Sequence, residues 1–455
     1  MLRYFLILTL YLFSTLASGW EDHALLTRKV LEGWMRRDVS AASYLNQSVQ
    51  VESLQSFLWA TKTTLPARMM EIETWARNRE PGYQPLPKQL IYDPARPDCA
   101  KALDVCFEKA LRINLDVPLR PMVYDPSGFY GRRRDFNRIL DAREMMPSYI
   151  AADNLRNRFV SVPDHAYLRL ADVIATASIQ PDFGFDVYLY ENNPSLFGKL
   201  YGFGSQPFGA AAIPYGSQGF FHMSSYHESG VLFLLMPTLK NTYPEYRAAM
   251  YMALSRFAAE TSHPYWAALF MGWGLHYVQD MTQPYHSSLT RGLTYSSILT
   301  ALVDKIRGND KAFSDLTNIQ ANRHILLENI ISHIMTSSKQ DFDEYKLLLN
   351  ANLIDSSRDN DIPGCAIQAN YLRNEIVPRV ERDASRYMAD FHELLPTGYA
   401  NNPEFNAGLF RDYDSLLLRD MSSSQRLRMS RELAPFLEWY GAYTRNCIRQ
   451  YGMKA

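Results

Sequence analysis

Helical periodicity of apolar residues is the feature that most constrains the fold of this chain. Near the N-terminus, for example, Leu26, Val30 and Trp34 recur at intervals of four residues. The stretches with this pattern, and therefore expected to be helical, are 20–37, 53–73 (with a break or kink at Pro66), 100–112, 243–280, 317–335, 366–395 and 423–449. Convincing alternating strands are scarce and no internal repeat is found. The sequence predicts a mainly α fold with long loops.

The composition is that of a globular chain without a basic surface. Hydrophobic residues make up 47% and charged residues 21% of 455 residues, so a sizeable core is possible and wholesale disorder is excluded. The formal net charge is -1. This balance disfavours binding along a long nucleic acid by bulk phosphate neutralisation, but it leaves open a nuclease that acts at a small site.

The N-terminus has the three parts of a secretory signal peptide. Arg3 precedes an apolar stretch, and the small residues 17–19 (Ala-Ser-Gly) form a cleavage site. The apolar run is too short to span a bilayer, and no other run of about 18 apolar residues follows. The sequence therefore predicts export, to the periplasm or outside the cell, with residues 1–19 removed and no transmembrane segment.

The four cysteines agree with export, because an exported chain usually oxidises its cysteines. Four cysteines allow three connectivities. We expect Cys99–Cys106, which closes a local loop, and Cys365–Cys447, which joins two positions late in the chain. The alternative is four free buried thiols. A thiolate zinc site is not expected, because no two cysteines have the close spacing that such sites use.

Residues 178–230 are rich in glycine, proline and aromatic residues and are expected to form a long loop. A loop of this length within a compact domain is usually functional. Its glycines do not have the spacing of a phosphate-binding loop, so no nucleotide site is predicted.

Two pairs of histidine and acid carry the strongest chemical signal. His276 and Asp280 are four residues apart, as are His324 and Glu328, so each pair shares one face of its expected helix. Pro284 should kink or end the first helix and turn His286 back toward the same cavity. Imidazole and carboxylate are the ligands of hydrolytic zinc, and two such pairs with an extra histidine suggest more than one ion. For either pair alone, a hydrogen-bonded surface pair is the simpler explanation.

The segment from His263-Pro264-Tyr265-Trp266 to His286, and above all the string His276-Tyr-Val-Gln-Asp280-Met-Thr-Gln-Pro-Tyr-His286, resembles the zinc-dependent phospholipase C and single-strand nuclease superfamily. Within that superfamily the chain looks most like the secreted bacterial phospholipases C. The resemblance implies a multi-helical core that holds three zinc ions. It covers about half of the chain and suggests a catalytic core over 20–340, with a C-terminal helical region of unknown role over 341–455.

The resemblance also implies a role for Trp20. In the superfamily the mature N-terminus is a tryptophan whose free amine and carbonyl oxygen bind zinc, and the signal peptide analysis places the cleavage directly before Trp20. Amine and carbonyl close a five-membered chelate. His23 is the expected companion ligand.

The other ligands follow from the same resemblance. His276 and Asp280 resemble the pair that helps to build a dinuclear site, with Asp280 bridging to the ion of Trp20 and His23. The ligands implied for the third ion are His286, His324 and Glu328.

Two positions, a histidine and an aspartate before His276, remain open between alternatives. The histidine is His222, with His227 as its competitor, and the aspartate is Asp182, with Asp186 as its rival. Ile179 and Gln180 stand where related sequences tend to carry acids. The histidines expected to be structural are His165, His263, His333 and His392.

The function implied is metal-assisted hydrolysis of a phosphodiester, in which a metal-activated water attacks phosphorus in line and Asp182 orients or deprotonates that water. We expect a secreted phospholipase C that contacts the membrane surface transiently and releases diacylglycerol and a phosphorylated head group, with residues 200–228 as an apolar lip. The alternatives are a single-strand nuclease or 3′-nucleotidase, for which nucleic acid is the partner, and a secreted binding protein with a structural metal cluster.

Overall fold

The computed structural model describes residues 22–133, 136, 138–150, 158–207, 211–212, 214–235, 237–336, 342–353, 356–388, 391–396 and 398–453. The expected signal peptide and Trp20 lie outside these residues. Helices dominate the described chain and its strands are short, so the prediction of a mainly α fold is confirmed.

Helices occur along the whole described chain. Those up to residue 235 are α2 (His23–Met35), α3 (Val39–Leu45), α4 (Leu54–Thr61), α5 (Leu65–Arg79), α6 (Pro97–Lys101), α7 (Leu103–Leu111), α8 (Leu170–Ala177), α9 (Gly198–Tyr201), α10 (Pro214–His222) and α11 (Gly230–Leu235). Those that follow are α12 (Pro244–Glu260), α13 (Pro264–Asp280), α14 (Pro284–Ser287), α15 (Tyr295–Ile306), α16 (Lys311–Thr336), α17 (Asp343–Leu353), α18 (Val377–Tyr387), α19 (Phe391–Leu394), α20 (Tyr413–Ser415) and α21 (Ser423–Ile448).

Short turns of 3-10 or π-helix connect these elements. They are η1 (Lys88–Leu90), η2 (Tyr130–Arg132), η3 (Ala142–Glu144), η4 (Gln180–Phe183), η5 (Pro237–Lys240), η6 (Ser357–Asn360), η7 (Ile367–Ala369), η8 (Leu372–Ile376), η9 (Leu416–Asp420) and η10 (Arg449–Met453). The strands form two small antiparallel ladders, β1 (Ser48–Gln50) with β4 (Tyr167–Arg169) and β2 (Met122–Tyr124) with β3 (Phe159–Ser161).

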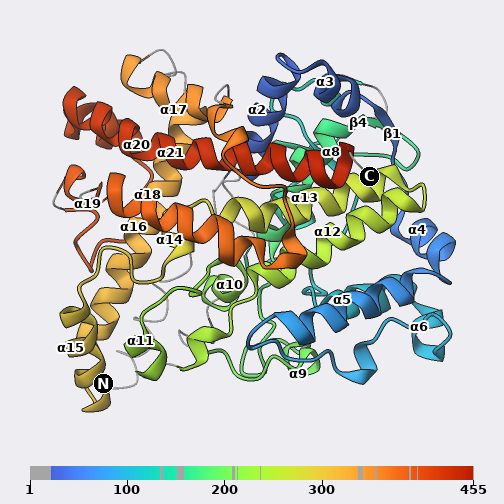
Figure 1. Ribbon diagram of the computed structural model, residues 1–455, viewed down its shortest axis with the longest axis horizontal. Helices are drawn as coiled ribbons and strands as arrows, with labels where there is room; N and C mark the ends of the chain where they lie inside the picture. Colours follow the sequence, from blue (N-terminus) through green and yellow to red (C-terminus); the bar gives the residue numbers. More distant parts are fainter. Residues whose placement is uncertain are drawn as a thin grey trace.

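Helices α12 and α13 run side by side through the centre of the molecule (Figure 1). The prediction of one helical stretch over 243–280 is wrong, because the chain turns between residues 261 and 263. Ser262 adopts a positive φ of 64°, and Pro264 has no N–H with which to continue a helix. The break at Pro66, by contrast, is confirmed: α4 ends at Thr61 and Pro66 lies in the first turn of α5.

Helix α13 packs against α8 at very close range. A Cβ atom on Gly272 would lie 2.7 Å from the carbonyl oxygen of Ile174 and would also collide with Ala177. Glycine is therefore required for this approach. The contact places the residues that follow α8 next to the C-terminal half of α13.

The C-terminal helix α21 lies against α2 and α13 (Figure 1). The hydroxyls of Tyr440 and Thr27 are 2.9 Å apart, and Gln279 donates to Thr444 Oγ1 over 3.0 Å. All four side chains are buried. Residues late in the chain thus pack directly on the helices at the centre.

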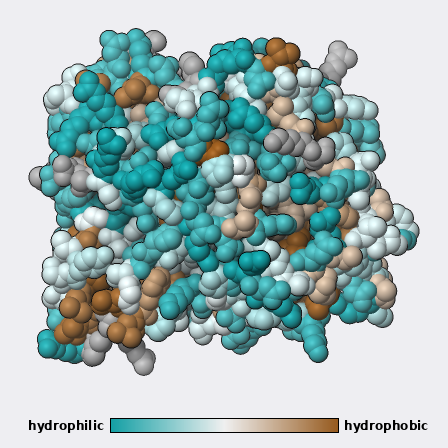
Figure 2. Space-filling view, in the orientation of Figure 1, coloured by the Kyte–Doolittle hydropathy of each residue, from teal (hydrophilic) through white to brown (hydrophobic). Residues whose placement is uncertain are grey.

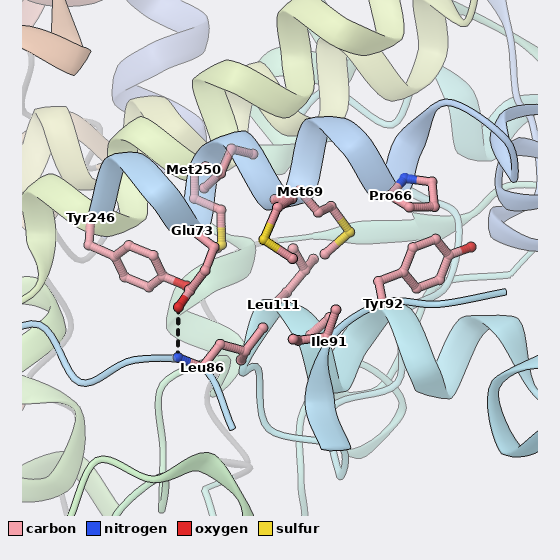
Figure 3. Close-up of a pocket in the computed structure, with 12 residues that line it drawn as sticks. Pro66, Met69, Glu73, Leu86, Ile91, Tyr92, Leu111, Tyr246 and Met250 are labelled. Atoms are coloured by element: carbon pink, nitrogen blue, oxygen red, sulfur yellow. Dashed lines mark hydrogen bonds between the residues drawn. The ribbon is translucent and has the colours of Figure 1, made fainter. Parts of the chain in front are cut away.

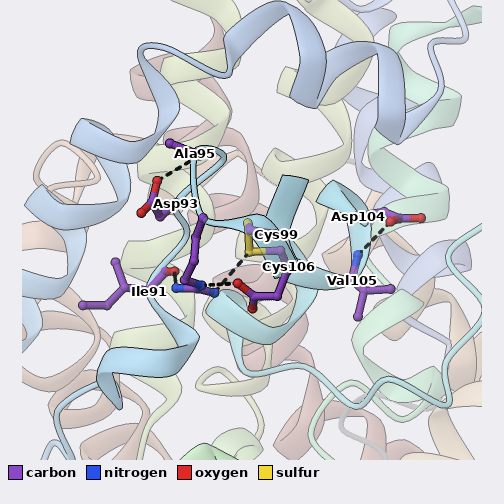
Figure 4. Close-up of a disulfide and its surroundings, with 9 residues drawn as sticks. Ile91, Asp93, Ala95, Cys99, Asp104, Val105 and Cys106 are labelled. Atoms are coloured by element: carbon purple, nitrogen blue, oxygen red, sulfur yellow. Dashed lines mark hydrogen bonds and ion pairs between the residues drawn. A yellow bond between two sulfur atoms is a disulfide. The ribbon is translucent and has the colours of Figure 1, made fainter. Parts of the chain in front are cut away.

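The cysteines pair as Cys99–Cys106 and Cys365–Cys447, which confirms the expected connectivity. The first disulfide joins α6 to α7 (Figure 4). Arg96 Nη2 lies 3.7 Å from Cys106 Sγ. The second ties the segment before η7 to the end of α21. In the part of the chain that the structure describes, no helix combines the length and the apolar character needed to cross a membrane.

The described residues between 178 and 230 contain more regular structure than the sequence suggests. They contain η4, α9 and α10. Tyr201, Phe203, Phe220 and Phe221 are buried, and the hydroxyl of Tyr201 donates to Ile113 O over 2.6 Å. These aromatic side chains belong to the core, so the expectation that they form an apolar lip is wrong.

Candidate metal centre

The last turn of α13 carries the centre of the site. His276 and Asp280 lie one turn apart, with 3.2 Å between His276 Nε2 and Asp280 Oδ2, and both are fully buried. Helix α13 ends at Asp280, and Pro284 starts the short helix α14, which carries His286. As expected from the proline, the chain returns His286 toward the same place: its Nδ1 lies 3.8 Å from Asp280 Oδ1.

Helix α16 supplies the second pair. His324 Nε2 lies 2.6 Å from Glu328 Oε1 and 2.8 Å from His286 Nε2, and His286 Nε2 lies 3.3 Å from Glu328 Oε1. The three side chains are buried. Their ligand atoms all face one another, as a shared ion would require.

His23, in the first turn of α2, reaches the other side of Asp280. The distance from His23 Nε2 to Asp280 Oδ1 is 3.1 Å. His23 Nδ1 donates to the side-chain oxygen of Gln279 over 2.8 Å, so Nε2 is the nitrogen left for a metal. Trp20, three residues earlier, lies outside the described residues.

Between the two candidate histidines, only His222 is in the cluster. It ends helix α10, and its Nδ1 lies 3.0 Å from Asp280 Oδ2 and 2.9 Å from His276 Nε2. His227 is exposed, and its Nε2 bonds to the carbonyl oxygen of Arg373 over 2.8 Å.

The two candidate aspartates have different surroundings. Asp182 Oδ1 lies 3.6 Å from His276 Nε2 and 3.8 Å from His222 Nδ1, and neither carboxylate oxygen has a hydrogen-bond partner among the described residues. Asp186 is instead held by Arg247 at 2.5 Å and by the hydroxyl of Tyr277 at 2.6 Å. A buried carboxylate without hydrogen bonds is costly, and a cation would compensate it.

The cluster divides into three groups whose ligand atoms lie within 4.8 Å of one another. These groups are His23, His276 and Asp280; Asp182, His222 and His276; and His286, His324 and Glu328. All of the expected ligands that the structure describes are therefore brought together. Histidine nitrogen and carboxylate oxygen in groups of three match the donor set of zinc.

Electrostatics in the first two groups favour ion pairing. Burial raises the pKa of Asp280, but His276 and His286 and the hydrogen bonds from His222 and His23 outweigh it and hold that pKa well below its usual range. Burial lowers the pKa of His222, yet its bonds to Asp186 and Asp280 raise it to about 10. For Asp182 burial dominates, and its pKa is raised.

In the third group, burial favours the neutral forms of the two histidines and of Glu328. Burial lowers the pKa of His324 to about 4, and it also lowers the pKa of His286. Burial raises the pKa of Glu328 to about 8, against the opposing effect of His286. Neutral imidazole is the form that binds a metal, whereas Glu328 would have to lose its proton.

Several supporting residues were not assigned a role from the sequence. Gln279 holds His23, Gln283 donates to Glu328 Oε1 over 2.8 Å, and the carbonyl oxygen of Ser178 accepts from His276 Nδ1 over 2.8 Å. Both glutamines lie in the string 276–286, so their position among the expected ligands could have indicated a supporting role. Nothing in the sequence indicated a role for the Ser178 carbonyl.

The remaining histidines have other partners or positions. His263 Nδ1 lies 2.9 Å from Glu52 Oε2, and His333 Nε2 lies 2.8 Å from Asp414 Oδ1. Neither belongs to the three groups, and neither do His165 and His392.

A separate cavity between α5, α7 and α12 is lined by apolar side chains such as Met69, Leu111 and Met250 (Figure 3). Its volume is about 30 Å³, the share of a single water molecule. It is too small for a substrate and contains none of the clustered residues.

No family model, no curated protein and no solved structure matches this chain. The functional argument therefore depends on the geometry of the clustered side chains.

Proposed function

We propose that the protein is a zinc-dependent phosphodiester hydrolase, and specifically a secreted phospholipase C. One observation carries the proposal: eight imidazoles and carboxylates, from segments far apart in the sequence, form one buried cluster that includes Asp280. They are His23, Asp182, His222, His276, Asp280, His286, His324 and Glu328.

The donor set supports zinc over harder cations. Each of the three groups contains at least one histidine, and calcium or magnesium would favour oxygen ligands alone. The two oxygens of Asp182, which accept no hydrogen bond from the described residues, also favour a bound cation. Under this proposal Trp20 would complete the ligand set of the ion next to His23.

The charge of the loaded site suits an anionic substrate. The described ligands include three carboxylates, those of Asp182, Asp280 and Glu328. Three divalent ions would outweigh these three negative charges, and the excess positive charge would attract a phosphodiester.

When bound, the ions would activate a water molecule and neutralise the negative charge on the phosphoryl oxygens and the leaving oxygen. The protein residues have separate tasks. Asp182 would receive the proton of the attacking water, because its oxygens make no other hydrogen bond among the described residues. Asp186 keeps His222 in place, and the Ser178 carbonyl fixes the ring of His276.

Phospholipid is the substrate we favour over nucleic acid. The expected signal peptide would direct export, and the near-zero net charge disfavours electrostatic binding along a polyanion. The two disulfides fit an oxidising compartment.

The test compares hydrolysis of phosphatidylcholine micelles with hydrolysis of single-stranded DNA, with and without a zinc chelator. We expect lipid cleavage that the chelator abolishes and zinc restores. His276→Ala should lose activity, whereas His333→Ala, a histidine outside the cluster, should keep it. Cleavage of DNA but not of lipid would refute the phospholipase function and favour the nuclease. Full activity of His276→Ala would refute the metal mechanism.

A further inference from the structure

A small apolar surface is formed by α11 and α15. Leu232, Leu239 and Leu302 make a hydrophobic cluster of their own, separate from the main core. Around it, large apolar side chains point to solvent: Leu234 is 80% exposed and Tyr295 74%. Val231 and Leu299 are exposed as well. Figure 2 shows the resulting brown patch at the lower left, where Figure 1 places α15 and α11.

This surface is built on the chain segments that carry the metal ligands. Helix α11 follows α10, which ends at His222, and α15 follows α14, which contains His286. Backbone atoms join the two segments where they leave the cluster: Ser224 N donates to His286 O over 2.7 Å. Helix α15 also packs on α16, the helix of His324 and Glu328. The helices of the apolar surface are therefore joined to the candidate site by short chain segments and by packing on α16.

The charge around the surface allows contact with phosphate head groups. Residues 229–240 and 289–303 include no aspartate or glutamate. The nearest preceding acid, Glu228, is turned inward and accepts hydrogen bonds from Leu289 N at 2.7 Å and Thr290 Oγ1 at 2.7 Å. Lys240 is exposed at the edge, with its Nζ 5.4 Å from the ring of Phe233. A membrane surface would meet apolar side chains and a cation here, and the next acid along α15 is the half-buried Asp304.

The size of the surface argues against a stable dimer. Four exposed apolar side chains define it. A stable protein interface uses on the order of 20–30 residues on each side. Shallow insertion of a few apolar side chains between lipid head groups needs no such area.

We propose that the α11–α15 surface, defined by Val231, Leu234, Tyr295 and Leu299, is the face with which this protein binds a phospholipid membrane. The biological role of this binding rests on the proposed phospholipase function. On the membrane, this face brings the segments of His222 and His286 toward the head groups.

The test is co-sedimentation of the mature full-length protein with phosphatidylcholine vesicles. Leu234→Asp/Leu299→Asp should weaken binding roughly tenfold or more, because two apolar contacts are replaced by charges that must stay hydrated. The matched control is Val39→Asp/Val105→Asp, which changes two exposed apolar residues of α3 and α7 and should bind like the wild type. If circular dichroism shows that the first variant folds poorly, Val231→Ser/Tyr295→Ser is tested in its place. We expect the same loss of vesicle binding.

Hydrolysis of a soluble short-chain substrate separates the two proposals. The surface variant should keep this activity, and His276→Ala should lose it while still sedimenting with vesicles. If the wild type binds vesicles but hydrolyses no lipid, the proposed phospholipase function is refuted and the proposed membrane-binding surface is supported. Unweakened binding of the surface variants would overturn the membrane surface. The proposal would also be overturned if the wild type forms a dimer and these substitutions abolish it. The face would then be an interface with a second copy of the chain.

Discussion

Thr444 accepts a hydrogen bond from Gln279 over 3.0 Å and thereby connects the C-terminal helix α21 to the candidate metal centre. The same Gln279 nitrogen donates to Thr27 over 2.9 Å, and the side-chain oxygen faces His23 Nδ1 at 2.8 Å. With its amide group fixed in this way, Gln279 can only accept from His23. Thr27 and Thr444 thus together orient the amide that fixes the tautomer of His23, a candidate metal ligand.

Removal of this hydrogen-bond chain should weaken zinc binding. We expect Gln279→Ala to lower the affinity of the ion at His23 by about 10- to 100-fold, the usual cost of losing a residue that orients a metal ligand. Thr444→Val should have a smaller effect of the same sign, because Thr27 still holds the amide. Competition with a chromophoric chelator measures both, with Gln50→Ala, an exposed residue of β1, as the control. Equal affinities in all four proteins would show that Gln279 plays no part in binding.

The number of ions should depend on which group is altered. His324→Ala removes a ligand of the third group only, so we expect the loss of about one zinc per molecule with the others retained. Asp280→Asn should have a wider effect, because Asp280 lies within 3.2 Å of His23, His222 and His276. Elemental analysis of dialysed protein gives the count. An unchanged zinc content in His324→Ala would contradict the assignment of the third group.

The contact between α8 and α13 should be sensitive to a single methyl group. Gly272→Ala would place its Cβ 2.7 Å from Ile174 O, and the helices would have to separate. We expect a loss of about 1–3 kcal/mol in the free energy of unfolding, as for other overpacked cores. Gly230→Ala, where a Cβ meets no atom within 4 Å, is the control. Chemical denaturation measures both, and equal stability would mean that the helices separate freely.

Spacing within one helix was enough to predict half of the described cluster. His276 with Asp280, and His324 with Glu328, are each four residues apart, and regular helices do bring each pair together. Pro284 indicated that the helix of His276 would not continue to His286, and the chain indeed ends α13 at Asp280 and begins α14 at Pro284. These predictions depend on local geometry, which the sequence determines directly.

The other ligands depend on tertiary packing. His222 ends a helix that contains Gly216 and Gly219, residues with low helix propensity, and so the sequence looks like a loop there. The choice of Asp182 over Asp186 follows from Arg247, which forms an ion pair with Asp186. Arg247 lies on a helix that begins more than 50 residues later in the chain. A pairing between distant segments of this kind leaves no periodic pattern in the sequence.

Glu108 should make stability fall as the pH rises toward neutrality. Burial, with the nearby Asp104, raises the pKa of Glu108 to about 7 from an ordinary value of 4.5. Below pH 4.5 the folded and unfolded chains both hold the proton, so the contribution is complete. Between that pH and about 7 the unfolded chain ionises first, and stability is lost. Glu108→Gln cannot ionise, so the wild type should lose about 1–3 kcal/mol relative to the variant across this window. Urea denaturation of both proteins at saturating zinc measures the difference, and parallel profiles from pH 4 to 8 would contradict the prediction.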